Sequence, residues 1–234
     1  MSGKIYLIPT TLGTESWDEV LPSYVAGIAR GIDVFVVENV RSARRFLSSL
    51  KMPKPISELH FTELNEHTPQ SDVEALLAPV LEGHNIGLLS EAGVPAVADP
   101  GSNLVRLAHK KGITIVPLVG PSSIILALMS SGLNGQNFAF VGYIPVKPNE
   151  RKARLKQLEH RLKTEGQTQL FIEAPYRNNQ LLADMVDTLD SNTLITIAAD
   201  ITLETEFIRT ATAKEWKQKM PDLHKRPSIF GIGM

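Results

Sequence analysis

Four segments of the sequence place glycine, proline and small residues directly after an apolar run. They are Pro9–Gly13, Leu88–Gly101, Val119–Ile124 and Phe171–Arg177. In the second segment, Gly93 and the neighbouring alanines let a ligand approach backbone N–H and C=O groups closely. Glu91 adds a carboxylate that could hold a ribose hydroxyl or a cationic amine. Such loops favour a small polar ligand bound largely by backbone, although the same residue types also make ordinary chain reversals.

Several common chemistries need residues that the sequence lacks. It contains no cysteine, which excludes disulfides, zinc ribbons, iron–sulfur clusters and thiol nucleophiles. It has no GxGxxG after the first apolar run, no GxxxxGK(S/T) and no GxSxG. None of its six histidines has a metal-ligating spacing such as HExxH, so we expect no metal ion.

The elements that must position these loops alternate between strand and helix. Apolar or β-branched runs predict strands at Lys4–Ile8, Val34–Val37, Leu59–Glu63, Ile86–Leu89, Ile113–Leu118, Phe138–Tyr143, Gln169–Glu173, Leu194–Ala199, Phe207–Thr210 and Ser228–Ile232. Helices are predicted between them, for example over Ser16–Arg30, with Thr14 or Ser16 as N-cap, and over Asp72–Leu81. Met129 and Met185 stand at helical spacing among apolar residues and are predicted to lie in the core. The alternation indicates an α/β fold, whose ligands bind beyond the carboxyl ends of the strands.

Composition and charge indicate a folded chain with two parts. Of its 234 residues, 43% are hydrophobic and 21% charged, and the net charge is −1, which is typical of a globular protein. Residues 1–117 carry 10 basic and 13 acidic residues, whereas residues 118–234 carry 14 and 12. We therefore predict an N-terminal domain over 1–117 and a C-terminal domain over 118–234. No membrane span or signal peptide is recognisable, so we expect a cytoplasmic protein.

Two basic clusters interrupt this near-neutral chain. Residues 39–57 contain Arg41, Arg44, Arg45, Lys51 and Lys54 with no acid, a local charge of +5. Residues 147–163 contain seven basic and two acidic residues, again +5. Phosphate binding needs such local charge, but a charge run is also typical of a solvated helix face.

The ordered set of motifs resembles the tetrapyrrole methylase superfamily, and most closely its branch that methylates the 2′-O of cytidine in small-subunit ribosomal RNA. The matching segments are Tyr6–Gly13, Leu89–Pro95, Ala98–Gly101, Gly120–Ser123, Ser130–Leu133, Glu38–Arg41, Phe140–Pro145 and Glu173–Arg177. They cover essentially the whole chain in the same order. Asn39, Glu91 and Tyr176 depart from the usual aspartate, aspartate and histidine of that branch. Family members also continue past the last strand, whereas this sequence ends at Met234.

The resemblance implies two α/β domains that bind S-adenosylmethionine in the cleft between them, usually in a homodimer. The expected activity is methylation of small-subunit ribosomal RNA. Methylation of a tetrapyrrole or corrin, or a non-catalytic member that binds the cofactor or RNA, stays open as an alternative. By analogy, the cofactor contacts fall on Pro9, Ser90, Glu91, Gly93, Val94, Pro121, Ser122, Ser123, Glu173, Ala174, Ala198, Ala199, Pro227, Ser228 and Ile229.

The acceptor side of such a reaction is less defined by the sequence. A ribose hydroxyl is a poor nucleophile whose proton must be removed or held. Candidate residues for this step are Glu38, Glu173, Tyr176 and His67, and no spacing separates them, so the catalytic residue is unassigned. The expected RNA contacts are Arg41, Arg44, Arg45, Lys147, Arg151, Arg154 and Arg177.

Overall fold

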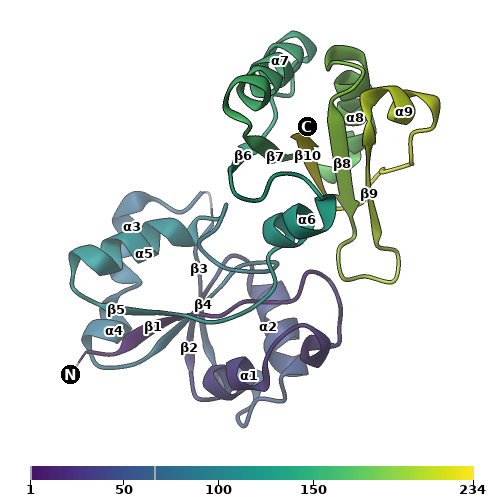
Figure 1. Ribbon diagram of the computed structural model, residues 1–234. Coiled ribbons are helices and arrows are strands. Elements are labelled where there is room, and N and C mark those ends of the chain that lie inside the picture. The colour runs from purple at the N-terminus through teal and green to yellow at the C-terminus, as the bar shows by residue number, and fades with distance from the viewer. Residues whose placement is uncertain (1, 66) are drawn as a thin grey trace. The chain divides into compact units, whose positions relative to one another are not determined.

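The computed structural model describes residues 2–65 and 67–234, which fold as two compact units. Unit 1 comprises residues 1–122 and unit 2 residues 123–234, so the boundary lies five residues after the predicted one between Pro117 and Leu118. Each unit contains one five-stranded sheet flanked by helices (Figure 1). Within the described residues, every helix is too short or too polar to span a bilayer.

The sheet of unit 1 is entirely parallel. Its strands are β1 (Lys4–Leu7), β2 (Val34–Val37), β3 (His60–Glu63), β4 (Ile86–Leu89) and β5 (Thr114–Pro117), in the order β3-β2-β4-β1-β5. The central strand β4 is buried along its whole length, which explains why its sequence is continuously apolar. Because the strands are parallel, all five carboxyl ends lie at one edge of this sheet.

Helices cover both faces of the unit 1 sheet. They are α1 (Ser23–Arg30), α2 (Val40–Ser49), α3 (Gln70–Ala75), α4 (Ala78–Leu81) and α5 (Gly101–Lys110), with 3-10 turns η1 (Trp17–Glu19) and η2 (Ile56–Glu58). Strand side chains alternate between two cores. Phe35 and Val37 pack with α1 and α2, whereas Val36 packs with α3, α4 and α5, as Figure 1 shows for the ribbons.

The sheet of unit 2 is mixed. Its strands are β6 (Phe138–Tyr143), β7 (Thr168–Ile172), β8 (Leu194–Ala199), β9 (Phe207–Thr212) and β10 (Ser228–Gly233), in the order β6-β7-β10-β8-β9. β6 and β7 are parallel, and the other three pairings are antiparallel. The last strand of the chain is therefore inserted between β7 and β8, where it is fully buried.

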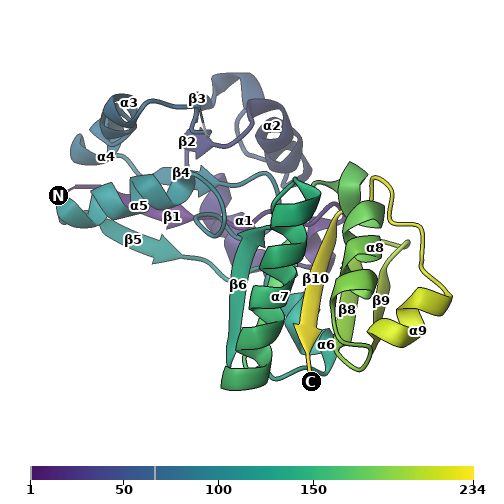
Figure 2. The same cartoon turned by 90° about the horizontal axis from the view of Figure 1, so that it is seen from above.

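Helices also cover the unit 2 sheet. They are α6 (Ser123–Ser131), α7 (Pro148–Glu165), α8 (Asn178–Thr188) and α9 (Ala213–Gln218), with the 3-10 turn η3 (Pro175–Arg177). Apolar side chains of α7, α8 and α9 form one core with the strands, and Figure 2 shows α7 and α8 lying along them. A Cβ on Gly233 would lie 2.5 Å from the Leu133 side chain, so glycine in β10 makes room for Leu133, two residues after the end of α6.

Three local predictions are wrong for identifiable reasons. The helix predicted over Ser16–Arg30 is split into η1 and α1, because Pro22 takes the N-cap position of α1 in extended conformation. The helix predicted over Asp72–Leu81 is divided into α3 and α4, with Pro79 in the first turn of α4. Met129 is 74% exposed although Met185 is buried, because helical spacing alone does not say which face of α6 meets the sheet.

Candidate functional site

Backbone hydrogen bonds tie the loop after β1 to the loop after β4. The N–H of Ile8 donates to Leu88 O, and the N–H of Thr10 donates to Gly93 O, each at 2.9 Å. In return, the N–H of Gly93 donates to Thr11 O at 3.3 Å. These bonds place the segment 90–94 against residues 9–12 at the carboxyl edge of the unit 1 sheet.

Two glycines allow the loop after β5 to pack against the loops after β1 and β4. Gly93 has φ = +74°, and a Cβ there would lie 3.0 Å from Pro121 O and 3.0 Å from the Leu12 side chain. A Cβ on Gly120 would lie 2.3 Å from the Pro9 ring. Three loops thus meet closely, and they bring together Pro9, Gly93 and Pro121, all of which the sequence analysis assigns to the cofactor.

Carboxylates hold the loop 90–101 in shape. Glu38 Oε2 accepts a 2.9 Å hydrogen bond from the N–H of Glu91, and Glu91 Oε1 accepts one from Ser42 Oγ. Asp99 accepts from the N–H groups of Ala96 and Gly101 at 2.7–2.9 Å. Glu38, a candidate base, is therefore engaged in positioning the loop.

Asp99 is a titratable residue that the sequence analysis did not select. The pKa of Asp99 is raised to about 6, mainly by burial and to a smaller extent by the charge of Glu38, while the hydrogen bonds from Gly101 and Ala96 oppose the shift. The residue stands at the turn that links the loop to α5. In the sequence, its position within the Ala98–Gly101 motif could have identified Asp99 as a candidate site residue.

A cavity of about 600 Å³ lies in unit 1 beside α2. We call it the α2 pocket. Its walls come from the loop after β1, from one face of α2 and from the start of the loop after β4. Its lining residues are Thr10, Thr11, Leu12, Gly13, Thr14, Glu15, Ser42, Arg45, Phe46, Ser48, Ser49, Ser90, Glu91 and Ala92. Half of these side chains carry hydroxyls, so the pocket suits a polar ligand. No single sequence motif spans this pocket, because residues from three distant segments form it.

The predicted cofactor residues of unit 2 gather at one edge of its sheet. Ser228 pairs with Ala199, and Ile229 pairs with Ala198 and with Ile172, the residue before Glu173. The antiparallel insertion of β10 thus places its amino end beside the carboxyl ends of β7 and β8. This arrangement brings together residues from three parts of the second half of the chain.

Glu173 occupies the centre of this edge and is buried. Its Oε1 accepts 2.6 Å hydrogen bonds from Arg177 Nη2 and from the N–H of Ala174. Its Oε2 is buried without a hydrogen-bond partner in the described residues. The Glu173 carboxylate raises the pKa of the Arg177 guanidinium, which also stacks over the exposed ring of Tyr176 at 4.7 Å. Two candidate bases thus contact a single arginine.

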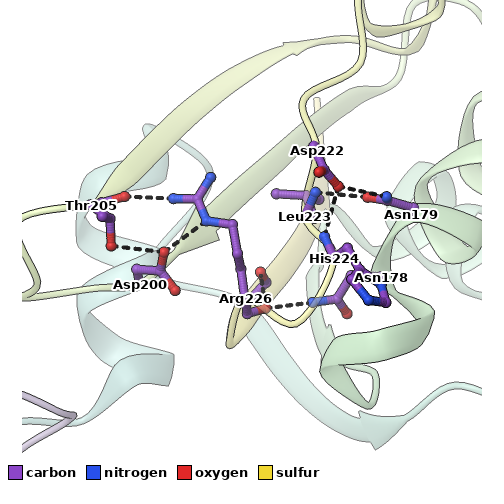
Figure 3. A network of polar contacts seen from close by, with 9 residues as sticks. Asn178, Asn179, Asp200, Thr205, Asp222, Leu223, His224 and Arg226 are labelled. Carbon is purple, nitrogen blue, oxygen red and sulfur yellow. Dashed lines mark hydrogen bonds and ion pairs between the residues drawn. The ribbon is translucent and has the colours of Figure 1, made fainter.

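A polar network fixes the segment that leads into β10 (Figure 3). Arg226 Nε donates to Asp200 Oδ2 at 2.7 Å, and Asn178 Nδ2 donates to Arg226 O at 2.7 Å. Asp200 also accepts from Thr205 Oγ1, and its N–H donates to Pro227 O. Asp200 has φ = +51°, a conformation that an L residue holds only when its surroundings enforce it.

The predicted RNA contacts differ in their exposure. Arg41, Arg44, Arg45 and Lys147 are exposed, whereas Arg154 and Arg177 are half-buried. Arg151 is 3% exposed, lies 2.9 Å from Asp184 Oδ2 and donates to Pro145 O and Val146 O. Since its guanidinium is used inside unit 2, including Arg151 among the RNA contacts is a misassignment, which arose because a charge run does not reveal which member faces inward.

The remaining predicted residues are placed as follows. Ser90 is buried and donates to Ala92 O and Gly93 O, while Val94, Ser122 and Ser123 are half-buried. His67 is exposed in the segment before α3. Among the residues that the structure describes, no three histidine or acidic side chains are grouped so as to hold a metal ion.

Comparisons with known proteins find relatives that match most of the chain. The chain is 32% identical over 213 residues to ribosomal RNA small subunit methyltransferase I of Escherichia coli O157:H7, covering 91% of this chain and 70% of that protein. It is 30% identical over 231 residues to the protein of the same name from Xylella fastidiosa, covering 98% and 80%. No family model matches the chain.

Solved structures share the fold at lower identity. The methyltransferase CobJ superposes with a TM-score of 0.67 at 17% identity, covering 99% of this chain and 94% of that one. A cobalt precorrin-4 methyltransferase superposes with a TM-score of 0.62 at 14% identity, covering 98% and 94%. These likenesses confirm the predicted tetrapyrrole methylase fold and carry no information about the substrate.

Proposed function

Because the chain belongs to the family of ribosomal RNA small subunit methyltransferase I, we propose that it transfers a methyl group from S-adenosylmethionine to a ribose 2′-oxygen of small-subunit ribosomal RNA. The observation that carries the proposal is the identity to these relatives over nearly the whole chain. The convergence of the strand-end loops supports it independently. The ribosomal substrate would place the protein in the cytoplasm, and the homodimer stays a prediction.

The residues present fit the proposed cofactor. In unit 1, Gly93 and Gly120 keep side chains out of a cradle of backbone groups formed by three loops. In unit 2, Glu173 Oε2 is a buried acceptor without a partner among the described residues, and an amine or hydroxyl group of a nucleoside could donate to it. We propose that the cofactor contacts are the predicted residues Pro9, Ser90, Glu91, Gly93, Val94, Pro121, Ser122, Ser123, Glu173, Ala174, Ala198, Ala199, Pro227, Ser228 and Ile229.

A bound sulfonium cofactor supplies an activated methyl group, so the protein needs neither a covalent nucleophile nor a metal for the transfer. The task of this chain is to orient the acceptor oxygen in line with the carbon–sulfur bond and to exclude water. Glu38 and Glu173 hold loops through hydrogen bonds to backbone and arginine. We therefore assign them positioning roles and leave the proton acceptor unassigned.

The proposal is tested by methyl transfer. Purified protein is incubated with S-adenosylmethionine labelled in the methyl group and with small ribosomal subunits from a strain that lacks the gene. We expect label in the ribosomal RNA, at a ribose, and none with subunits from a strain that carries the gene. Label in a tetrapyrrole or corrin instead would support the alternative substrate. Tight cofactor binding without transfer would indicate the non-catalytic alternative, and either result would overturn the proposal.

A further inference from the structure

We propose that the α2 pocket receives the acceptor ribonucleotide, with Arg45 binding a backbone phosphate and the hydroxyl-bearing wall binding the sugar and base. This inference rests on the proposed function, because it concerns the substrate of the same reaction. It assigns a binding role to Thr10, which lies in the Pro9–Gly13 loop, and to Ser42 and Ser48, which lie outside every motif.

The position of the α2 pocket fits an acceptor rather than the cofactor. Of the predicted cofactor residues in unit 1, only Ser90 and Glu91 line it, whereas Pro9, Gly93, Val94, Pro121 and Ser122 do not. The pocket therefore adjoins the cofactor loop along one wall and extends away from it toward α2. An acceptor must occupy such a neighbouring position, since the reacting atoms have to approach to about 3–3.5 Å.

The chemistry of the walls fits a nucleotide. Thr10 is 4% exposed, and its Oγ1 has no hydrogen-bond partner among the described residues, although the residue lines the pocket. A buried hydroxyl without a partner is unusual unless a ligand or water completes it. Ser42 Oγ donates to Glu91 Oε1 and so presents its lone pairs as acceptors for a hydroxyl or amino group.

One arginine that lines the pocket is available to bind a phosphate. Arg45 is exposed and lines the pocket, and no hydrogen bond or ion pair to it occurs within residues 2–65 and 67–234. Its neighbour Arg44 instead stacks over Phe61 at 5.3 Å. A guanidinium that is not engaged elsewhere can bind phosphate in bidentate geometry. Of the three arginines in α2, Arg45 alone lines the pocket.

The size of the pocket agrees with one nucleotide. Its volume of about 600 Å³ lies within the range of about 300–1,000 Å³ that is typical of small-molecule sites. A tetrapyrrole-sized, mostly apolar cleft would need few hydroxyls, whereas half of the residues lining this pocket carry them. Sequence-specific RNA recognition favours single, unstacked nucleotides of this kind.

Two substitutions test the inference. Arg45→Glu reverses the charge, and Ser48→Trp places a large ring in the pocket from an exposed position on α2. We expect each to lower kcat/KM for small subunits at least tenfold, while the Kd for S-adenosylmethionine changes less than twofold. The matched controls are Arg106→Glu on α5 and Ser57→Trp in η2, which are exposed and lie outside the pocket. Arg45→Lys, which keeps the charge, should restore part of the activity.

Thr10→Val gives a finer test. It keeps the shape of the side chain but removes Oγ1, so we expect a severalfold rise in KM with unchanged thermal stability. Wild-type transfer together with unaffected pocket variants would overturn the inference while leaving the proposed function intact. A loss of cofactor affinity in Ser48→Trp would also overturn it, because the pocket would then belong to the cofactor. Absence of transfer by the wild type would instead refute the proposed function.

Discussion

The two units present loops at a sheet edge by different means. In unit 1 all five strands are parallel, so every strand reaches that edge at its carboxyl end. In unit 2 the buried strand β10 begins at the edge where β7 and β8 end. Parallel topology gathers the loops of unit 1, glycines let them approach, and the carboxylates of Glu38 and Asp99 accept hydrogen bonds from the backbone of one loop. The loops of unit 2 depend on charged and amide side chains that fix the entry into β10.

This contrast indicates that the loops of unit 1 and the loops of unit 2 are sensitive to different kinds of substitution. Unit 1 should be sensitive to any added Cβ at the glycines where its loops meet, because backbone atoms have no room to retreat. Unit 2 should be sensitive to the loss of single polar groups such as Asp200 or Arg226, since each leaves a partner unsatisfied. The following substitutions test that distinction.

Asp200→Ala should have the largest effect. Asp200 is 8% exposed and pairs with Arg226 and Thr205, so its loss leaves a partly buried guanidinium without its ion pair. We expect the free energy of unfolding of unit 2 to fall by about 2–3 kcal/mol, somewhat less than for a fully buried pair. Urea denaturation measures this change. The control Asp187→Ala breaks an ion pair with Lys217 in which both side chains are more than half exposed, and should cost less than about 1 kcal/mol.

Gly93→Ala should have an effect of intermediate size. The positive φ costs about 1–2 kcal/mol for an L residue, and the new methyl group would also press on Pro121 O. We expect lower stability and at least a tenfold loss of S-adenosylmethionine affinity in calorimetry. Gly112→Ala is the matched control, because Gly112 has φ = +68° but an added Cβ there would meet no atom within 4 Å. Equal cofactor affinities of the two variants would contradict the proposal that the loop containing Gly93 contacts the cofactor.

Asp99→Asn should change the pH dependence of stability. The pKa of Asp99 is raised to about 6 in the folded chain from a reference value of 3.8, so the folded state retains a proton that the unfolded state has lost. The resulting stabilisation is complete below pH 4 and is lost as pH rises through about 6. We expect the asparagine variant to lose this decline in the free energy of unfolding between pH 4 and pH 7. Asp18→Asn, at an exposed carboxylate, should leave the decline in place.

Lys147→Glu combined with Arg154→Glu should have the smallest effect. These residues lie at the surface of unit 2, and each contributes at most one phosphate contact. We expect weaker binding of small subunits and a shallower salt dependence, by about 0.7 in the log–log slope for each lost contact to single-stranded RNA. Filter binding across a salt series measures both. An unchanged slope would show that this cluster is a solvated helix face.

Sequence patterns were sufficient where structure depends on neighbours along the chain. Every predicted strand is present, and the loop at Gly93 follows β4 as expected, because apolar runs and glycines act locally. The insertion of β10 between β7 and β8 could not be predicted, since strand pairing is set by packing across the chain. The burial of Arg151 against Asp184 could not be predicted for the same reason. The α2 pocket likewise needs three segments that only the folded sheet brings together.

A crystal structure of the full chain with S-adenosylhomocysteine tests the central claim most directly. We predict electron density for the molecule within hydrogen-bonding distance of the backbone at Gly93 and Val94. Density that leaves the backbone of both residues without a contact would contradict the account.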